Sequence, residues 1–199
     1  ERLDYFGAAV NLAARALPLA KGDVILTLNT RDRACLIERG CDPYKPQSEA
    51  ARAMFNAMID RHPALIVRCA NEADVVAALA HARAHRIPIT VRGGGHSPAG
   101  RSIADGAMMI DLSPMNAVEI DAERGIVRVG PGAVGADLDD ATQAHGLATT
   151  GGTYSGTGVT GLSLGGGMGF LARRFGLAVD NMIGADVVLA DGSRVHASA

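Results

Sequence analysis

The chain has 199 residues, of which 48% are hydrophobic and 20% charged, so it is long enough for one large domain or two small lobes. A net charge of −2 and only 4% aromatic residues, with no tryptophan, argue against nucleic acids and anionic membrane surfaces as partners. No apolar run reaches the roughly 18 residues that a membrane span needs, so the sequence predicts no transmembrane helix.

Apolar periodicity and turn residues predict alternating helices and strands along the chain. Ser48 is a candidate N-cap of a helix whose apolar stripe includes Met54, Phe55, Met58 and Ile59. In chain order, the predicted elements are a helix at 8–20, a strand at 23–28, a helix at 48–61, a strand at 64–67, a helix at 72–85, strands at 88–91, 108–112, 117–121 and 125–129, a helix at 134–145, a helix at 162–175 interrupted by Gly165-Gly166-Gly167, and strands at 185–189 and 193–197 joined by an Asp191-Gly192 hairpin turn.

These elements predict an α/β lobe followed by an α+β lobe. The strand–helix–strand unit over residues 64–91 favours parallel pairing through a right-handed crossover. The later strands are short, and the polar segment 121–125, ending in glycine, is a turn between two of them. We therefore expect an N-terminal extension over residues 1–46, a first lobe over 47–115 and a second lobe over 116–199.

Two glycine-dense stretches dominate the functional reading of the chain. The first, Arg92-Gly93-Gly94-Gly95-His96-Ser97, begins where the predicted strand 88–91 ends, and the second contains nine glycines between Gly151 and Gly169. Ordering so much glycine is entropically costly, and a chain tolerates it where the backbone turns sharply or closely approaches a ligand. Rows of backbone N–H groups bind phosphate, and His96 adds a side chain capable of chemistry.

Other motifs are weaker. The segment Gly156–Gly161 has the GxGxxG pattern of dinucleotide-binding folds, but no predicted strand directly precedes it, so an NAD(P)-binding Rossmann module stays an alternative. A Walker A loop is excluded, because the only lysines are Lys21 and Lys45. His81 and His85 have helical metal-ligand spacing without the glutamate of HExxH, and we expect no metal.

Cysteine usage gives little functional information. Cys35, Cys41 and Cys69 are an odd number without CxxC spacing, which predicts neither a disulfide framework nor a zinc site. Three unpaired thiols fit a reducing compartment, and we therefore expect a cytoplasmic location.

Four segments together resemble the FAD-binding domain of the vanillyl-alcohol-oxidase superfamily, the PCMH-type flavin domain, and within it the berberine-bridge-enzyme-like FAD-linked oxidases. They are Pro63–Arg68 with the helix after it, Val91–Ser97, Gly151–Gly169, and Phe175–Asn181 leading to Val187–Gly192. The resemblance implies an α+β fold of the PCMH type, in which two α/β lobes hold the flavin between them.

The resemblance also implies a set of FAD-binding residues. The backbone of the first glycine stretch would wrap the FAD pyrophosphate, and a ring nitrogen of His96 would bond covalently to the 8α-methyl carbon of the flavin. The second stretch would line the far side of the cofactor, and Val195 would lie near the adenine. The implied cofactor-binding residues are Arg92, Gly93, Gly94, Gly95, His96, Ser97, Gly152, Thr153, Gly156, Thr157, Gly161, Leu162 and Val195.

Two departures from the family pattern qualify this expectation. Tyr154 stands where some members form a second flavin bond through cysteine, so we expect a single covalent bond. The family's substrate domain, which supplies the catalytic base, follows the FAD domain, so we expect it to be absent from this chain and assign no catalytic residue.

The implied activity is FAD-dependent oxidation of a small molecule. A C–H group of an alcohol, sugar or amine would give hydride to flavin N5, and O₂ would accept the electrons. Three alternatives stay open: a non-covalent FAD dehydrogenase, the NAD(P)-binding Rossmann module, and a flavin-binding fragment without turnover.

Overall fold

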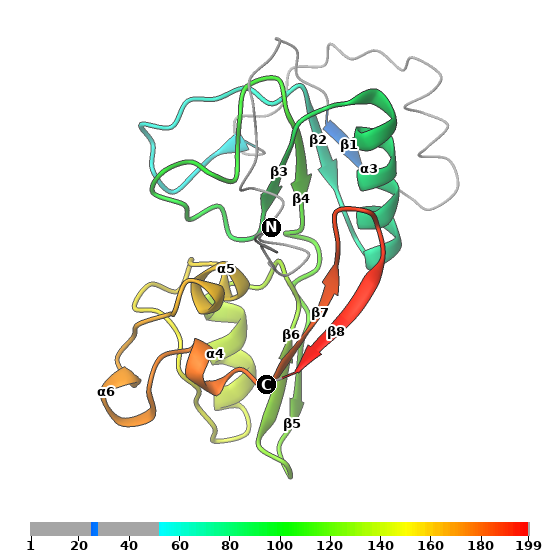
Figure 1. The fold of residues 1–199 in the computed structure, drawn as a ribbon. Helices are drawn as coiled ribbons and strands as arrows, with labels where there is room; N and C mark the ends of the chain where they lie inside the picture. Colours follow the sequence, from blue (N-terminus) through cyan, green and yellow to red (C-terminus); the bar gives the residue numbers. More distant parts are fainter. Residues whose placement is uncertain (1–24, 28–51, 199) are drawn as a thin grey trace, which may run out of the picture.

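The computed structural model describes residues 25–27 and 52–198, arranged as two lobes joined by a hairpin (Figure 1). The predicted helix at 8–20, the first residues of the predicted helix at 48–61, and Cys35 and Cys41 lie outside the described residues. The elements are β1 (Ile25–Thr27), β2 (Leu65–Arg68), α3 (Glu72–His85), β3 (Ile89–Arg92), β4 (Met108–Asp111), β5 (Val118–Asp121), β6 (Ile126–Val129), α4 (Gly135–Gln143), α5 (Val159–Leu164), α6 (Ala172–Phe175), η2 (Val179–Asn181), β7 (Gly184–Val188) and β8 (Arg194–Ser198).

A four-stranded parallel sheet with the order β1-β2-β4-β3 forms the first lobe. The strands β2 and β3 are parallel, as the strand–helix–strand unit predicts, but they are not neighbours, because β4 lies between them. All four residues of β4 are buried. The apolar residues Met108, Met109 and Ile110 fit this strand's place between β2 and β3 in the sheet. The sheet also takes β1 from the segment that the sequence presents as an N-terminal extension.

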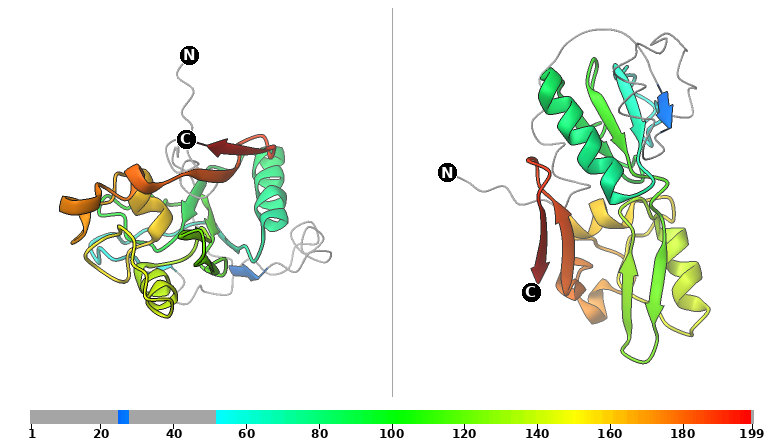
Figure 2. Two further views of the ribbon diagram at one scale, coloured as in Figure 1. Left: turned by 90° about the horizontal axis from the view of Figure 1, so that it is seen from below. Right: turned by 90° about the vertical axis from the view of Figure 1, so that its right-hand side faces the viewer.

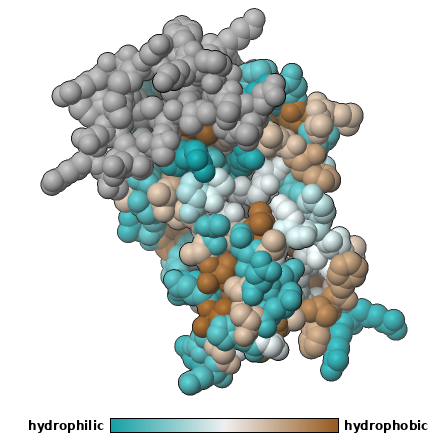
Figure 3. Space-filling model, turned by 180° about the vertical axis from the view of Figure 1, so that it is seen from behind, coloured by the Kyte–Doolittle hydropathy of each residue, from teal (hydrophilic) through white to brown (hydrophobic). Residues whose placement is uncertain are grey.

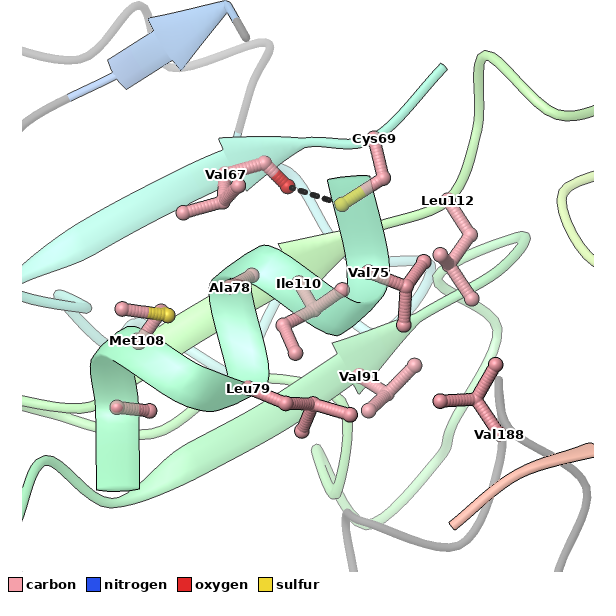
Figure 4. Close-up of a cluster of buried hydrophobic side chains, with 11 residues drawn as sticks. Val67, Cys69, Val75, Ala78, Leu79, Val91, Met108, Ile110, Leu112 and Val188 are labelled. Carbon is pink, nitrogen blue, oxygen red and sulfur yellow. Dashed lines mark hydrogen bonds between the residues drawn. The ribbon is translucent and has the colours of Figure 1, made fainter. Parts of the chain in front are cut away.

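Helix α3 covers one face of this sheet and forms the main core with it (Figure 4). Its sequence specifies both ends, because the Asn71 side chain accepts a hydrogen bond from the Asp74 backbone and Arg86 ends the helix in a left-handed conformation. The buried side chains of this core are Val67, Cys69, Val75, Ala78, Leu79, Ala82, Val91, Met108, Ile110, Leu112 and Val188. The predicted helix over 72–85 is confirmed.

The predicted helix at 48–61 is wrong over residues 53–61, which form turns, bends and irregular backbone, while Arg52 is helical. Met54 and Ile59 pack against a small buried cluster on the other face of the sheet, while Phe55 and Met58 stay exposed. The Phe55 N–H donates to Gly95 O at 3.1 Å instead of to a helical carbonyl. Contacts with distant residues have therefore overridden the local helical pattern.

The second lobe contains the β5–β6 hairpin, helix α4, and the short helices α5 and α6. The strands β5 and β6 are antiparallel, and Gly146 follows α4 with a φ of +66°. The predicted helix at 162–175 is two short helices, α5 and α6, which the glycine run at 165–167 separates. No helix in the described ranges is long and apolar enough to cross a membrane. On the face seen in Figure 3, hydrophobic atoms form separate patches among hydrophilic ones.

The β7–β8 hairpin contacts both lobes (Figure 2). Val188 of β7 belongs to the core under α3, and Arg194 of β8 forms an ion pair with Glu72 at 2.9 Å. On the other side, Arg128 of β6 pairs with Asp186 of β7 at 2.7 Å. The hairpin, predicted as part of the second lobe, therefore ties the two lobes together.

Candidate functional site

The two glycine stretches meet backbone to backbone. A Cβ atom built on Gly94 would lie 2.7 Å from the Cα of Gly158, and one built on Gly158 would lie 2.6 Å from the backbone N of Gly94. Real Cβ atoms do not approach other atoms this closely, so glycine is needed at both positions. A Cβ on Gly93 would likewise lie 2.9 Å from the Pro131 carbonyl oxygen at the end of β6.

The first stretch leaves a row of backbone donors unused. Among the described residues, no acceptor is found for the N–H groups from Gly93 through Ser97, although they follow a buried strand. Gly95 has a φ of +66°, the left-handed conformation that turns successive N–H groups into one concavity. Buried or half-buried N–H groups without acceptors are rare, and a concave row of them is typical of an anion site.

Arg92 anchors the entrance of this loop. Its carbonyl oxygen accepts a hydrogen bond from Leu112 N at 2.8 Å, which extends the β3–β4 ladder by one residue. A Cβ on Gly95 would lie 3.0 Å from the Arg92 Nε, so the guanidinium folds back beside the turn. A fixed positive charge thus lies next to the row of N–H groups.

His96 lies between two aromatic rings. Its imidazole stacks on Phe55 with ring centroids 3.8 Å apart and an interplanar angle of 18°. The ring of Tyr154, from the second stretch, has its centroid 5.2 Å from that of the imidazole, and the two ring planes are inclined at 43°. The Nε2 atom of His96 is buried and has no hydrogen-bond partner among the described residues. A buried ring nitrogen without a partner is costly, which fits a group whose partner is a bound molecule.

The second stretch is held against the start of α4. Gly135 N donates to Thr157 O at 3.0 Å, Ala136 N donates to Ser155 O at 2.9 Å, and Val159 N donates to Ala133 O at 2.9 Å. The first two bonds satisfy N–H groups at the start of α4, and the third satisfies the first N–H group of α5. All three bonds hold residues 154–159 in place. Gly158 therefore lies against Gly94, and Tyr154 lies beside His96.

The ends of the second stretch also close on one another. A Cβ on Gly169 would collide with the carbonyl oxygen of Gly151, and one on Gly152 would lie 3.1 Å from a Leu162 methyl carbon. Ala178 N donates to Gly167 O at 2.9 Å, which ties the stretch to the segment before β7. The nineteen-residue loop is therefore compact.

The structure places most of the predicted residues in this one region. The first stretch and the Gly156–Gly158 turn lie in contact, and Gly152 lies against Leu162. The Ser97 hydroxyl accepts a hydrogen bond from Arg101 N at 3.0 Å, so it also serves the loop itself. Thr153 is exposed, and Gly161 has no atom within 4 Å of its Cβ position.

Val195 lies apart from the others. It pairs with Val187 in the β7–β8 hairpin and lines a pocket of about 320 Å³ together with Glu72, Asp186, Arg194 and His196. No residue of either glycine stretch lines that pocket. Its predicted place near an adenine ring stays a prediction.

Sequence reasoning missed Phe55 and Gly158 as members of the site. The sequence pattern predicts Phe55 in a helical stripe, and its ring reaches His96 because residues 53–61 are not helical. Gly158 stands inside GxGxxG, so a signal was present, but its role as the contact of Gly94 depends on the folded arrangement.

The structure does not support two other kinds of site. Residues 144–157, before Gly158, contain no strand, whereas a Rossmann phosphate loop directly follows one. No group of three or more metal-ligating side chains is found in the described part of the chain. Within residues 52–198, the carboxyl groups whose pKa is lowered are Asp60, Asp186 and Asp191, and all three lie outside the glycine stretches.

Two lobes, a row of N–H groups without acceptors among the described residues and a histidine in that row are typical of a domain that binds a phosphate-bearing cofactor. Residues 63–198 match the family model described as the FAD binding domain. The chain belongs to this family and is an FAD-binding domain. The predicted PCMH-type fold and the resemblance to berberine-bridge-enzyme-like proteins are therefore confirmed.

Several characterised proteins are similar to the chain. (R)-6-hydroxynicotine oxidase of Paenarthrobacter nicotinovorans is 37% identical over 156 residues, which are 77% of this chain and 34% of that protein. The structure of BBE-like 1 from Physcomitrella patens matches with a TM-score of 0.75 and 29% identity, over 85% of this chain and 38% of the other.

A third similar structure carries a named flavin linkage. Glucooligosaccharide oxidase of Acremonium strictum, described with a 6-S-cysteinyl, 8α-N1-histidyl FAD, matches with a TM-score of 0.72 and 33% identity, over 77% of this chain and 33% of the other. The chain thus spans about a third of the length of the relatives that it matches.

Proposed function

We propose that this chain is the cofactor domain of an FAD-linked oxidoreductase that oxidises an alcohol, sugar or amine C–H group, with O₂ as electron acceptor. When bound, FAD supplies the redox chemistry, taking hydride at N5 and passing two electrons to O₂. The observation that carries the proposal is the row of N–H groups from Gly93 to Ser97, which have no acceptor in the part of the chain that the structure describes, with His96 inside it. The oxidase names of the similar proteins support the acceptor and the substrate classes.

The chain's own residues would hold the cofactor mainly through backbone. The N–H groups of Gly93 to Ser97 would bind the pyrophosphate oxygens, with the Arg92 guanidinium nearby. Gly152, Thr153, Gly156, Thr157, Gly161 and Leu162 would line the opposite side, and Val195 would lie toward the adenine. Backbone donors fixed in place before binding cost little reorganisation when the anion arrives.

We further propose that His96 forms one covalent bond to the flavin. A ring nitrogen of His96 bonds to the 8α carbon, replacing one 8α C–H bond and the imidazole N–H bond by a C–N bond. The two hydrogens and their electrons leave to O₂, which gives H₂O₂. The unpartnered, buried Nε2 supports a histidine whose partner is the cofactor.

A second covalent bond through cysteine is not part of the proposal. By the resemblance, Tyr154 would stand at the position of that cysteine, and the centroid of its ring lies 5.2 Å from that of the imidazole. Cys69, the one cysteine among the described residues, is fully buried in the core under α3 and is not available to a cofactor.

Acid precipitation of the purified full-length protein tests both FAD binding and the covalent bond to His96. We expect the wild-type pellet to keep flavin absorbance and the His96→Ala pellet to lose it, while His96→Ala still releases FAD into the supernatant. Flavin released from the wild type would leave only a non-covalent flavoprotein. Absence of flavin from pellet and supernatant, even after incubation with FAD, would overturn the cofactor assignment.

The activity is tested separately on the flavin-loaded protein. Oxygen uptake and H₂O₂ formation are measured with panels of sugars, secondary alcohols and cyclic amines. Turnover with one class would identify the substrate class. Anaerobic flavin bleaching without oxygen uptake would favour a dehydrogenase with another acceptor, and bleaching by no panel member would favour flavin binding without turnover.

A further inference from the structure

The ring of Phe55 lies on His96 although the two residues are far apart in the sequence. Their centroids are 3.8 Å apart with an interplanar angle of 18°, which is a parallel stack. The same residue is fixed by its backbone, because Phe55 N donates to Gly95 O at 3.1 Å. Phe55 is therefore attached at two points to the loop that carries the histidine.

Phe55 contributes little to the hydrophobic core. It is 56% exposed, and the buried cluster on its face of the sheet consists of Ile66, Ile103 and Met109, with Met54 and Ile59 packed against them. Burial in the core therefore does not determine the position of the Phe55 ring. Its main contacts with ring systems are with His96 and, at 5.7 Å, with Tyr154.

A histidine that follows three glycines needs an external support. The flanking glycines offer no side chains against which the imidazole could pack, and its Nε2 makes no hydrogen bond among the described residues that would fix the ring. Stacking on Phe55 sets the plane of the ring, and Tyr154 limits its rotation from a second direction. Bond formation depends on such orientation, because the reacting atoms must be held close together and aligned.

We propose that Phe55 is a positioning residue for flavin attachment: its ring holds the His96 imidazole in the orientation from which a ring nitrogen bonds to the 8α carbon. This inference rests on the proposed covalent link. The step forms one C–N bond, breaks one 8α C–H bond and the imidazole N–H bond, and transfers two hydrogens with their electrons to O₂. Phe55 itself touches His96 and takes no part in the electron or proton transfer.

The test is the rate of covalent attachment in the full-length protein. Apoprotein from riboflavin-limited cells is mixed with excess FAD in air, and acid-insoluble flavin fluorescence is followed over time. Total bound flavin is measured in parallel by gel filtration. We expect Phe55→Ala to attach flavin about 2- to 12-fold more slowly at unchanged total binding, the range that loss of one aromatic stack implies.

Matched variants separate positioning from bulk and from folding. Phe55→Tyr keeps the stack and is expected to restore the wild-type rate, whereas Phe55→Leu keeps apolar volume without an aromatic plane and is expected to be slow. If Phe55→Ala does not fold, the Leu variant decides the question. Phe175→Ala, an exposed phenylalanine of α6 that lies 51% open, is expected to behave as wild type.

The failures of the two proposals are distinguishable. A wild-type attachment rate in both Phe55→Ala and Phe55→Leu would overturn the positioning role and leave the His96 link intact. A wild-type protein that binds FAD without acid-insoluble flavin would overturn the link itself. A slow rate caused only by weakened total binding would show that Phe55 contacts the cofactor rather than positions the histidine.

Discussion

Gly94 and Gly158 approach so closely that neither position has room for a side chain. A Cβ on Gly94 would lie 2.7 Å from Gly158 Cα, and a Cβ on Gly158 would lie 2.6 Å from Gly94 N. The contact joins the end of a parallel sheet in one lobe to a loop of the other lobe. The spacing of the two glycine stretches of the candidate site therefore depends on the absence of a side chain at both positions.

Gly94→Ala should separate the loops and weaken FAD binding. Gly94 has no positive φ, so the added methyl acts through the collision alone. We expect a loss of about 1–3 kcal/mol in the free energy of unfolding, as for other overpacked sites. Urea unfolding and total flavin content measure the effect. Gly151→Ala, with nothing within 4 Å of its Cβ position, is the control, and equal losses in both variants would contradict the argument.

Asp186 makes the stability of the β7–β8 hairpin pH-dependent. Hydrogen bonds from His196 first and Arg128 second hold the pKa of its carboxyl group below the ordinary 3.8. A lowered carboxyl pKa stabilises the fold above pH 3.8, and that contribution is lost as the pH falls through the folded-state pKa.

Asp186→Asn should therefore lower stability near neutral pH and have no effect in strong acid. Because the ion pairs are exposed, we expect a difference below about 1 kcal/mol at neutral pH. Urea midpoints of wild type and variant, measured at a series of pH values, should converge as the pH falls. Asp139→Asn on α4, whose side chain makes no ion pair among the described residues, should show no such convergence.

Asn71 determines where α3 begins. Its side-chain oxygen accepts a hydrogen bond from Asp74 N at 3.1 Å, and the Asp74 carboxylate accepts one from Ala70 N at 2.9 Å. Asn71→Ala should cost about 1 kcal/mol in the free energy of unfolding, while Asn71→Asp keeps the acceptor. Chemical denaturation distinguishes them, and similar losses in both would mean that the cap contributes nothing.

Asn181 fixes the turn that follows the second glycine stretch. Its Nδ2 lies 2.8 Å from Phe175 O, 2.9 Å from Leu177 O and 3.2 Å from Thr150 Oγ1. Asn181→Asp replaces the donating NH2 group by a carboxylate oxygen, which can only accept and would face carbonyl oxygens, so we expect a loss of about 1–3 kcal/mol in stability. Thermal melting measures it. Asn116→Asp, an exposed amide whose side chain has no hydrogen bond among the described residues, should melt as wild type.

The sequence predicts those elements whose signals are local. Helix α3 has its cap at Asn71 and its apolar face within fourteen residues, and the Asp191-Gly192 turn joins β7 to β8. The strand order, in contrast, has no local signal in the sequence. The insertion of β4 between β2 and β3 is a property of the whole sheet, and no residue between 64 and 91 indicates it.

The candidate site divides in the same way. Glycine density and the placement of His96 after a strand indicate a cofactor loop from the sequence alone. The partner of His96 could not be predicted, because the residues around Phe55 carry a helical apolar pattern that tertiary contacts override. The contact between Gly94 and Gly158 likewise exists only once the lobes are assembled.

The hairpin that spans the lobes has a consequence for how a ligand would be received. Val188 is fixed in the core of the first lobe, Arg194 pairs with Glu72 at 2.9 Å, and Asp186 pairs with Arg128 of the second lobe at 2.7 Å. The lobes can move apart only by breaking these contacts together with that between Gly94 and Gly158. The two glycine stretches are thus held together before a ligand arrives, so the binding energy of a cofactor is not spent on bringing them together.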